Sequence, residues 1–61
     1  MDAREQFKQN GFDVEVEVET PDLFWCHLIS VGGYGRVPNY GSGSTEQEAV
    51  KRAWQRYEEE Q

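Results

Sequence analysis

An unbroken alternation of apolar and acidic residues, from Phe12 to Glu19, constrains the fold of this chain more than any other feature. Successive side chains of a β-strand point to opposite faces, so the alternation predicts a strand with one apolar and one acidic face. The apolar face carries Phe12, Val14, Val16 and Val18. The acidic face carries Asp13, Glu15, Glu17 and Glu19. Because like charges in a row repel, we expect the acidic face to stay in water or to meet a positively charged partner.

Length and charge narrow the classes of function. The chain has 61 residues, with twelve acidic against six basic side chains and a formal net charge of −6. This length predicts one small α+β domain over residues 1–61, near the lower limit for a self-supporting core. Nucleic acid is a disfavoured partner, because proteins that bind it gain most of their affinity by neutralising phosphates with Lys and Arg. The charge favours a basic protein partner, although it also serves solubility.

The remaining composition predicts a cytoplasmic protein without a membrane partner. Cys26 is the single cysteine, so no disulfide forms within the chain, and one free thiol fits a reducing compartment. No apolar run approaches the ~18 residues of a membrane span. No basic segment followed by an apolar one opens the chain, as a signal peptide would require.

Helix formers, strand formers and turn residues predict five elements in an α-β-β-β-α order. They are a helix over 2–9, strands over 12–19, 23–31 and 36–40, and a long helix over 46–59. The segment 41–44 is expected to be a flexible turn, and Thr45 with Glu48 is expected to cap the long helix. Pro38 places the third strand at a sheet edge. The fold class is therefore α+β, with a three-stranded antiparallel sheet and the long helix packed on one face.

One apolar stripe runs along the long helix, and it must pack on the sheet. Within ~140° of one another lie Ala49, Val50, Ala53, Trp54 and Tyr57. We expect Trp54 at the centre of this stripe, opposite the valines of the first strand.

The second strand has no polar face, which leaves two interpretations open. One side carries Leu23, Trp25, His27, Ile29 and Val31, and the other carries Phe24, Cys26, Leu28 and Ser30. Only one side can face the long helix, so the other must lie beside the carboxylates of the first strand. Either the N-terminal helix covers that side through Phe7, or Trp25 or Phe24 forms an aromatic anchor inside a charged rim.

The sequence contains no pattern typical of a catalytic site or a metal-binding site. Cys26 and His27 are neighbours on a strand and point to opposite faces, so they cannot form a nucleophilic pair. One Cys and one His are too few for a zinc site, and a straight row of carboxylates does not converge on calcium. The short glycine-rich segments lack the lysine of a phosphate-binding loop. We therefore expect a protein that is not an enzyme and that has no metal or cofactor.

The stretch from Tyr40 to Ala49, continuing through Ala53, resembles the junction of third strand and helix in double-stranded-RNA-binding domains. That resemblance implies the same element order. In that family a lysine cluster opens the last helix and grips phosphates, whereas the matching positions here are Thr45, Glu46, Gln47 and Glu48. An acidic helix N-terminus repels phosphate. Residual contact with nucleic acid would fall to Arg36, Lys51, Arg52 and Arg56.

Residues 12–60 are also similar to HicB-type antitoxins, in which strands precede a helix entry of the form Gly-x-Thr-x-x-Glu-Ala. The matching segment here is 43–49. This resemblance implies a domain that neutralises a small basic toxin.

Together these observations predict a non-enzymatic protein-interaction module that uses its acidic sheet face and edge strand. We expect it to bind a positively charged protein, as an antitoxin, an inhibitor or an accessory factor would. The expected partner-binding residues are Asp13, Glu15, Glu17, Glu19, Phe24 and Trp25. A degenerate double-stranded-RNA-binding-like domain and a structural homodimer stay open as alternatives. The edge glutamates either guard against aggregation or leave the edge to a partner strand or a second copy.

Overall fold

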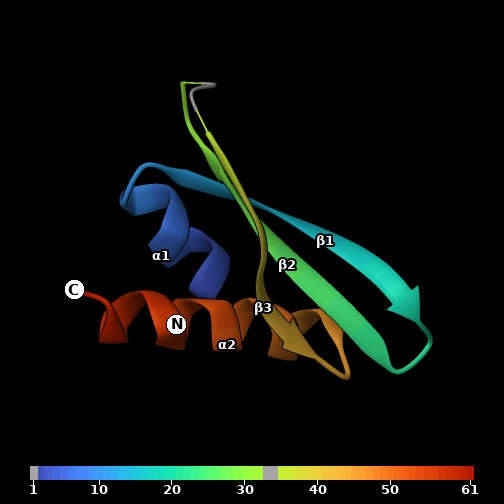
Figure 1. Cartoon of the computed structure of the whole chain (residues 1–61). Coiled ribbons are helices and arrows are strands. Elements are labelled where there is room, and N and C mark those ends of the chain that lie inside the picture. The colour runs from blue at the N-terminus through green and yellow to red at the C-terminus, as the bar shows by residue number, and fades with distance from the viewer. Residues whose placement is uncertain (1, 33–34) are drawn as a thin grey trace.

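The computed structural model describes residues 2–32 and 35–61, which form five elements around one sheet. In chain order these are α1 (Ala3–Gln9), β1 (Phe12–Thr20), β2 (Leu23–Ser30), β3 (Arg36–Gly43) and α2 (Glu46–Glu59) (Figure 1). The strands are antiparallel and lie in the order β1-β2-β3. The α+β class and the element order predicted from the sequence are confirmed. Gly33 and Tyr34, in the expected glycine-rich loop, lie outside the described residues.

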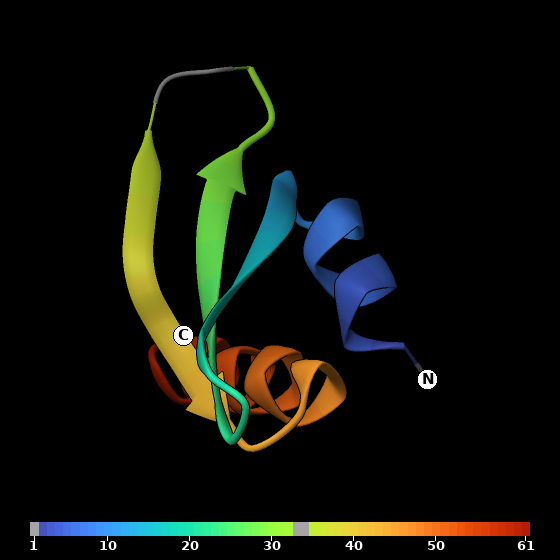
Figure 2. The same cartoon turned by 90° about the vertical axis from the view of Figure 1, so that its right-hand side faces the viewer.

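Both helices pack on the same face of the sheet, which we call the helix-covered face (Figure 2). Phe7 of α1 is fully buried, and its ring meets Trp54 and Tyr57 of α2 edge-on at centroid distances of 5.1 and 5.7 Å. Phe12 at the start of β1 meets Tyr57 at 5.6 Å. The N-terminal helix therefore completes the core beside α2. The N-terminal helix does not cover the side of β2 that carries Trp25 and His27. The interpretation that Phe7 covers this side is therefore wrong.

Local signals set the helix ends where the sequence predicts them. The Asp2 side chain accepts a hydrogen bond from the Arg4 backbone N–H at 3.0 Å. Gly11 follows α1 with a φ of 86°, in the left-handed region that glycine adopts without strain. Thr45 Oγ1 accepts from the Glu48 N–H at 3.1 Å and opens α2. None of the described helices is long and apolar enough to cross a membrane.

Small residues, and not Trp54, occupy the centre of the α2 interface. Ala49, Val50 and Ala53 are buried, whereas Trp54 is partly exposed and stacks on Tyr57 at a centroid distance of 5.4 Å. The expectation of a central Trp54 is therefore wrong. The physical reason is that alanines let the helix axis approach the sheet closely, which displaces the large indole to the side, where it covers Phe7.

The glycines before α2 belong to β3, because the strand continues to Gly43. The expected flexible turn over 41–44 is therefore wrong for residues 41–43, and only Ser44 lies outside the strand. A Cβ at Gly41 would lie 2.6 Å from the Ala53 Cβ, and one at Gly43 would lie 2.7 Å from the Ala49 nitrogen. Neither distance is tolerable for real atoms. Glycine is needed here for contact between strand and helix, and not for flexibility.

A bulge in β3 divides the strand into two paired parts. Cys26 pairs with Gly41 and Leu28 pairs with Val37, so three residues of β3 lie opposite one residue of β2. Asn39 in this bulge has a φ of 53°, a left-handed conformation that asparagine adopts more readily than most residues. The bulge lies at the edge strand, where the sequence places Pro38.

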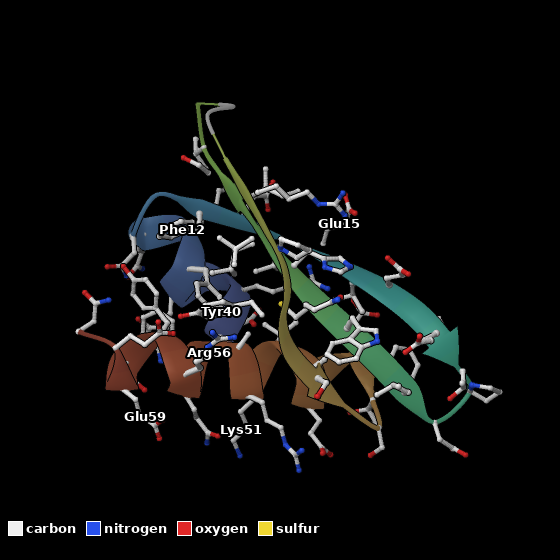
Figure 3. All side chains as sticks on the ribbon, in the orientation of Figure 1. Phe12, Glu15, Tyr40, Lys51, Arg56 and Glu59 are labelled. Atoms are coloured by element: carbon white, nitrogen blue, oxygen red, sulfur yellow. The ribbon has the colours of Figure 1, made fainter. Side chains whose placement is uncertain are left out.

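Tyr40, the last residue of the bulge, connects β3 to the end of α2. Its hydroxyl donates to Glu60 at 2.5 Å, and the Arg56 guanidinium lies over its ring at 4.4 Å (Figure 3). Arg56 also donates to the Tyr40 carbonyl oxygen at 3.2 Å. Burial, reinforced by the hydrogen bond to Glu60, raises the pKa of Tyr40 to about 12. The side chain therefore stays protonated and keeps this contact.

Candidate functional site

The candidate site is the face of the sheet turned away from both helices, which we call the outer face. It carries Asp13, Glu15, Glu17 and Glu19 from β1, Leu23, Trp25, His27 and Ile29 from β2, and Arg36 and Ser42 from β3. The register sets Glu15 opposite His27 and Glu17 opposite Trp25. Figure 3 shows Glu15 on the far side of the sheet from α2. The acidic row and one side of β2 thus share a surface, as the alternation predicts.

Three of the four carboxylates on this face, those of Glu15, Glu17 and Glu19, bind a side chain of another strand. Glu15 accepts from Arg36 at 2.9 Å, across the width of the sheet. Glu19 accepts from the Trp25 indole N–H at 2.5 Å. The sequence shows these residues but not which of them become neighbours, because that depends on the register and on the bulge. The acidic row therefore stays exposed, as expected, and one of its carboxylates meets a positive group of the same chain, Arg36.

His27 is the most buried residue of the outer face, with 3% exposure. Its Nδ1 accepts from the Asn39 backbone N–H at 2.8 Å, and its Nε2 lies 3.1 Å from a Glu17 carboxylate oxygen. A nitrogen that accepts carries no proton, so this geometry requires the neutral ring with its proton on Nε2, donating to Glu17. The bulge in β3 supplies the backbone donor. Both ring nitrogens are occupied, and neither is free for a ligand.

The contacts orient the carboxylates but leave them accessible. The side chains of Glu15 and Glu17 remain 55% and 62% exposed. Exposed ion pairs contribute only about 0–1 kcal/mol, so these contacts are not a major source of stability. Four carboxylates against one arginine and a neutral histidine leave the outer face negative. The face therefore presents fixed acidic groups beside the partly buried Trp25.

Phe24 does not join the other expected partner-binding residues. It pairs with Val18 and packs beside the core on the helix-covered face. The reason is the strand period, since Phe24 is even-numbered like Cys26 and Leu28, which face α2. Of the two aromatic anchors proposed from the sequence, only Trp25 lies on the acidic face.

Cys26 and His27 lie on opposite faces of β2, as expected, and do not approach one another. Cys26 is fully buried, and burial raises the pKa of its thiol to about 11. The thiol is therefore protonated at neutral pH. Among the residues that the structure describes, no group of three or more His, Cys, Asp or Glu side chains could hold a metal ion.

The basic residues of the nucleic-acid alternative are dispersed and mostly paired. Arg36 binds Glu15 on the outer face, while the other three lie on α2. Arg52 binds Glu48 at 2.9 Å, and Arg56 binds Glu60 at 3.0 Å. Lys51 alone of the four forms no ion pair within residues 2–32 and 35–61. The structure thus forms no single basic surface from these side chains.

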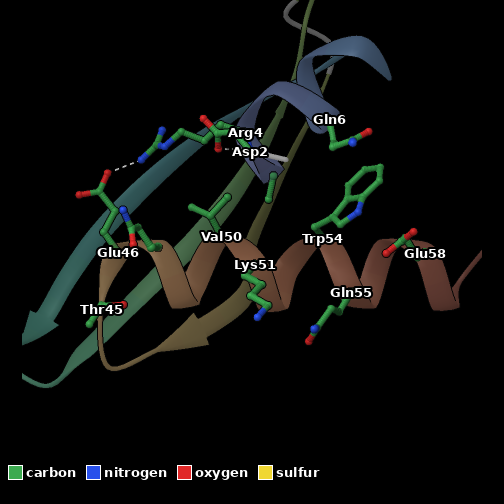
Figure 4. A pocket seen from close by; sticks show the side chains of 12 residues that line it. Asp2, Arg4, Gln6, Thr45, Glu46, Val50, Lys51, Trp54, Gln55 and Glu58 are labelled. Atoms are coloured by element: carbon green, nitrogen blue, oxygen red, sulfur yellow. Dashed lines mark hydrogen bonds and ion pairs between the residues drawn. The ribbon is translucent and has the colours of Figure 1, made fainter.

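A second feature is an open groove between α1 and α2, on the other side of the molecule (Figure 4). Arg4 and Glu46 form an ion pair at one end. Lys51 and Trp54 line the middle. The groove mixes both signs of charge with one aromatic ring. It does not bring together any of the partner-binding residues expected from the sequence.

Comparison of the chain with protein-family models, with curated proteins and with solved structures finds no match. The resemblances to double-stranded-RNA-binding domains and to HicB-type antitoxins therefore stay predictions. The outer face combines oriented, accessible carboxylates with the exposed edge strand β1, and it is the surface best suited to bind a partner.

Proposed function

We propose that this chain is a non-enzymatic protein-interaction module that binds a basic protein through its outer face and the adjoining edge of β1. One observation carries the proposal. Neither helix covers the outer face, yet that face holds a row of accessible carboxylates, oriented by cross-strand contacts, next to the Trp25 ring.

This arrangement has the composition of a protein-binding surface. Interfaces commonly combine an aromatic anchor with a polar rim, and Trp is among the residues most often found to dominate binding energy. Here Trp25 is held by Glu19, and Glu15 is held by Arg36. Side chains that are already ordered lose less conformational entropy when a partner binds. A negative face also accelerates the encounter with a positive one.

The similarity of residues 12–60 to HicB-type antitoxins supports a partner of the same kind. That family neutralises a small basic toxin, and a basic partner is what the outer face and the net charge of −6 favour. An antitoxin-like, inhibitor-like or accessory role follows from the same chemistry.

The two alternatives receive less support from the described residues. Arg36, Arg52 and Arg56 are neutralised by glutamates, which weakens a degenerate RNA-binding role. A homodimer formed through two outer faces would bring two acidic surfaces together, which is electrostatically unfavourable. A basic protein partner avoids this repulsion.

A capture experiment with matched charge variants tests the proposal. The outer-face variant carries Glu15→Gln and Glu17→Gln, and the control variant carries Glu58→Gln and Glu59→Gln, two exposed residues of α2. Each loses two negative charges. Wild type and control variant, immobilised and exposed to extract of the native host, should retain the same basic proteins, and the outer-face variant should retain less of them. Equal retention by all three would contradict the proposal.

Binding of duplex RNA tests the RNA-binding alternative. We expect it to bind no better than about 10⁻⁴ M near physiological salt, the weak limit of nonspecific binding. Micromolar binding with a steep dependence on salt would favour the RNA-binding alternative over the proposed function.

A further inference from the structure

The edge of β1 exposes the backbone groups of its apolar residues. The Ser30 N–H donates to the Gly35 oxygen on the β3 side, and the Val31 N–H donates to the Gly11 oxygen on the β1 side, both at 2.9 Å. Backbone groups of an antiparallel strand alternate in direction, so odd residues of β2 face β1. Their partners in β1 are the acidic residues. The valines of β1 therefore turn their N–H and C=O groups away from β2, toward the open edge.

A hydrogen bond on β1 independently supports this orientation. The Val14 N–H donates to the Asp13 carboxylate at 3.0 Å, which is available only to an amide that is not bonded to β2. Asp13 thus covers the first of the outward amides. Val16 and Val18 follow at the same edge with the same orientation.

The second half of β1 is accessible along this edge. β1 is the end of the β1-β2-β3 order, so no further strand of the described residues lies beyond it. α1 lies beside the start of β1, whereas the end of β1 extends past both helices (Figure 1). Val18 is 59% exposed, which is unusual for a large apolar side chain on the helix-covered face.

We propose that β1 pairs, through Val16 and Val18, with an extended segment of a basic protein in which Lys or Arg alternates with apolar residues. This inference rests on the proposed function and specifies the chemistry of the partner. A strand added to a sheet edge gains main-chain hydrogen bonds, and its alternate side chains supply specificity. Its basic side chains would lie on the outer face beside Glu15 and Glu17. Its apolar side chains would extend the helix-covered face beside Val16 and Val18.

Charge excludes a second copy as the favoured occupant. Pairing of two β1 edges would place one row of carboxylates directly beside another on the outer face, and like charges in neighbouring strands destabilise a sheet. A segment with alternating basic residues reverses the sign of those cross-strand pairs. The same edge therefore favours a heterologous strand.

The probe for this inference is a blocked eight-residue peptide that alternates lysine and valine. Hydrogen exchange of the Val16 and Val18 amides in ¹⁵N-labelled protein should slow when the peptide binds. The outer-face variant loses two cross-strand charge pairs with the peptide, so it should bind the peptide about two- to thirtyfold more weakly than the wild type does. The control variant should bind as the wild type does. A peptide of the same composition with four lysines followed by four valines should not protect the two amides.

Backbone methylation of the probe tests strand pairing directly. One derivative carries N-methyl groups on its valines, and the other carries them on its lysines. Only one set of peptide N–H groups faces β1, so only one derivative should lose binding. If the derivative methylated on its valines loses binding, the pairing is antiparallel. In an antiparallel pair, the peptide residues that exchange hydrogen bonds with Val16 and Val18 carry their side chains on the same face as these two residues, so they are the valines of the peptide. Equal binding by both derivatives would overturn the inference.

Three other outcomes separate this inference from the proposed function. In the first outcome, the peptide binds, perturbs the Trp25 indole signal and binds the outer-face variant more weakly, but it does not protect the Val16 and Val18 amides. This result would overturn strand pairing and would leave the proposed function standing. Protection of the same amides without peptide, rising with protein concentration, would assign the edge to a second copy. No peptide binding at millimolar concentration would overturn the inference, while the capture experiment would still decide the proposed function.

Discussion

The two faces of the sheet share three strands but differ in what holds them. The helix-covered face is closed by apolar contacts, and Phe7, Cys26, Ala49 and Ala53 have no exposed surface. The outer face is held by hydrogen bonds and ion pairs whose carboxylates remain more than half exposed. Burial of apolar surface dominates folding stability, whereas exposed polar pairs contribute little. Apolar contacts on the helix-covered face therefore supply most of the folding stability, which leaves the outer face available for the proposed binding role.

Phe7→Ala should break the helix-covered face and produce the largest effect. Truncation of a buried Phe costs about 3–5 kcal/mol. A domain of this size has roughly 3–9 kcal/mol of stability in total, so the variant should be marginally folded. Urea unfolding measures the difference. Trp25→Ala on the outer face is the comparison and should cost less than half as much, and equal costs would contradict the assignment of the core.

Gly41→Ala tests the closest contact of the same face. The added Cβ would lie 2.6 Å from the Ala53 Cβ, so helix and strand must separate. Overpacking of this kind costs about 1–3 kcal/mol. Gly35→Ala is the matched control, since a Cβ there meets nothing within 4 Å. Thermal unfolding should show a clear loss for the first variant and almost none for the second.

Alkaline pH should weaken the helix-covered face through its two buried titratable groups. Folding raises the pKa of Cys26 from 9.0 to about 11 and that of Tyr40 from 10.0 to about 12. The unfolded chain therefore loses these protons first, and stability falls as the pH rises above 9. The expected loss is about 1–2 kcal/mol at pH 10. Unfolding at pH 7 and pH 10 measures it, and a stability that stays constant over this range would contradict the burial of both groups.

The outer-face variant should have the smallest effect on stability. Exposed ion pairs and repulsion between like charges are each worth less than about 1 kcal/mol, and here they act in opposite directions. Glutamine also keeps an oxygen that can accept from Arg36 or His27. The free energy of unfolding should remain within about 0.5 kcal/mol of that of the wild type. A loss above about 2 kcal/mol would show that the outer face is a structural element.

The sequence predicts the elements of this fold well because their signals are local. Alternation defines β1, the Asn10-Gly11 pair ends α1, and the Thr45 cap opens α2. The errors concern tertiary contacts. From the sequence alone, Gly41 indicates a turn, and only the proximity of Ala53 in the structure shows that it is a contact residue. A large side chain at position 54 is a plausible core centre until the short distance between helix and strand is known.

The candidate site was only half predictable for the same reason. The acidic row and Trp25 follow from the strand period, and the structure places them together. The pairing of Glu17 with His27, and of His27 with the Asn39 backbone, depends on a bulge that no local motif marks. Placement of Phe24 required knowing which side of β2 faces α2.

Association kinetics test the central claim, that the outer face is the binding surface, most directly. A basic protein captured by the wild type is mixed with the wild type, the outer-face variant and the control variant, at low and at high salt. Charges at the rim of an interface act mainly on the encounter rate and are screened by salt. The outer-face variant should associate more slowly than the control variant at low salt, and the difference should shrink as salt rises. Equal rates for the two variants at low salt, with both folds intact, would contradict the claim.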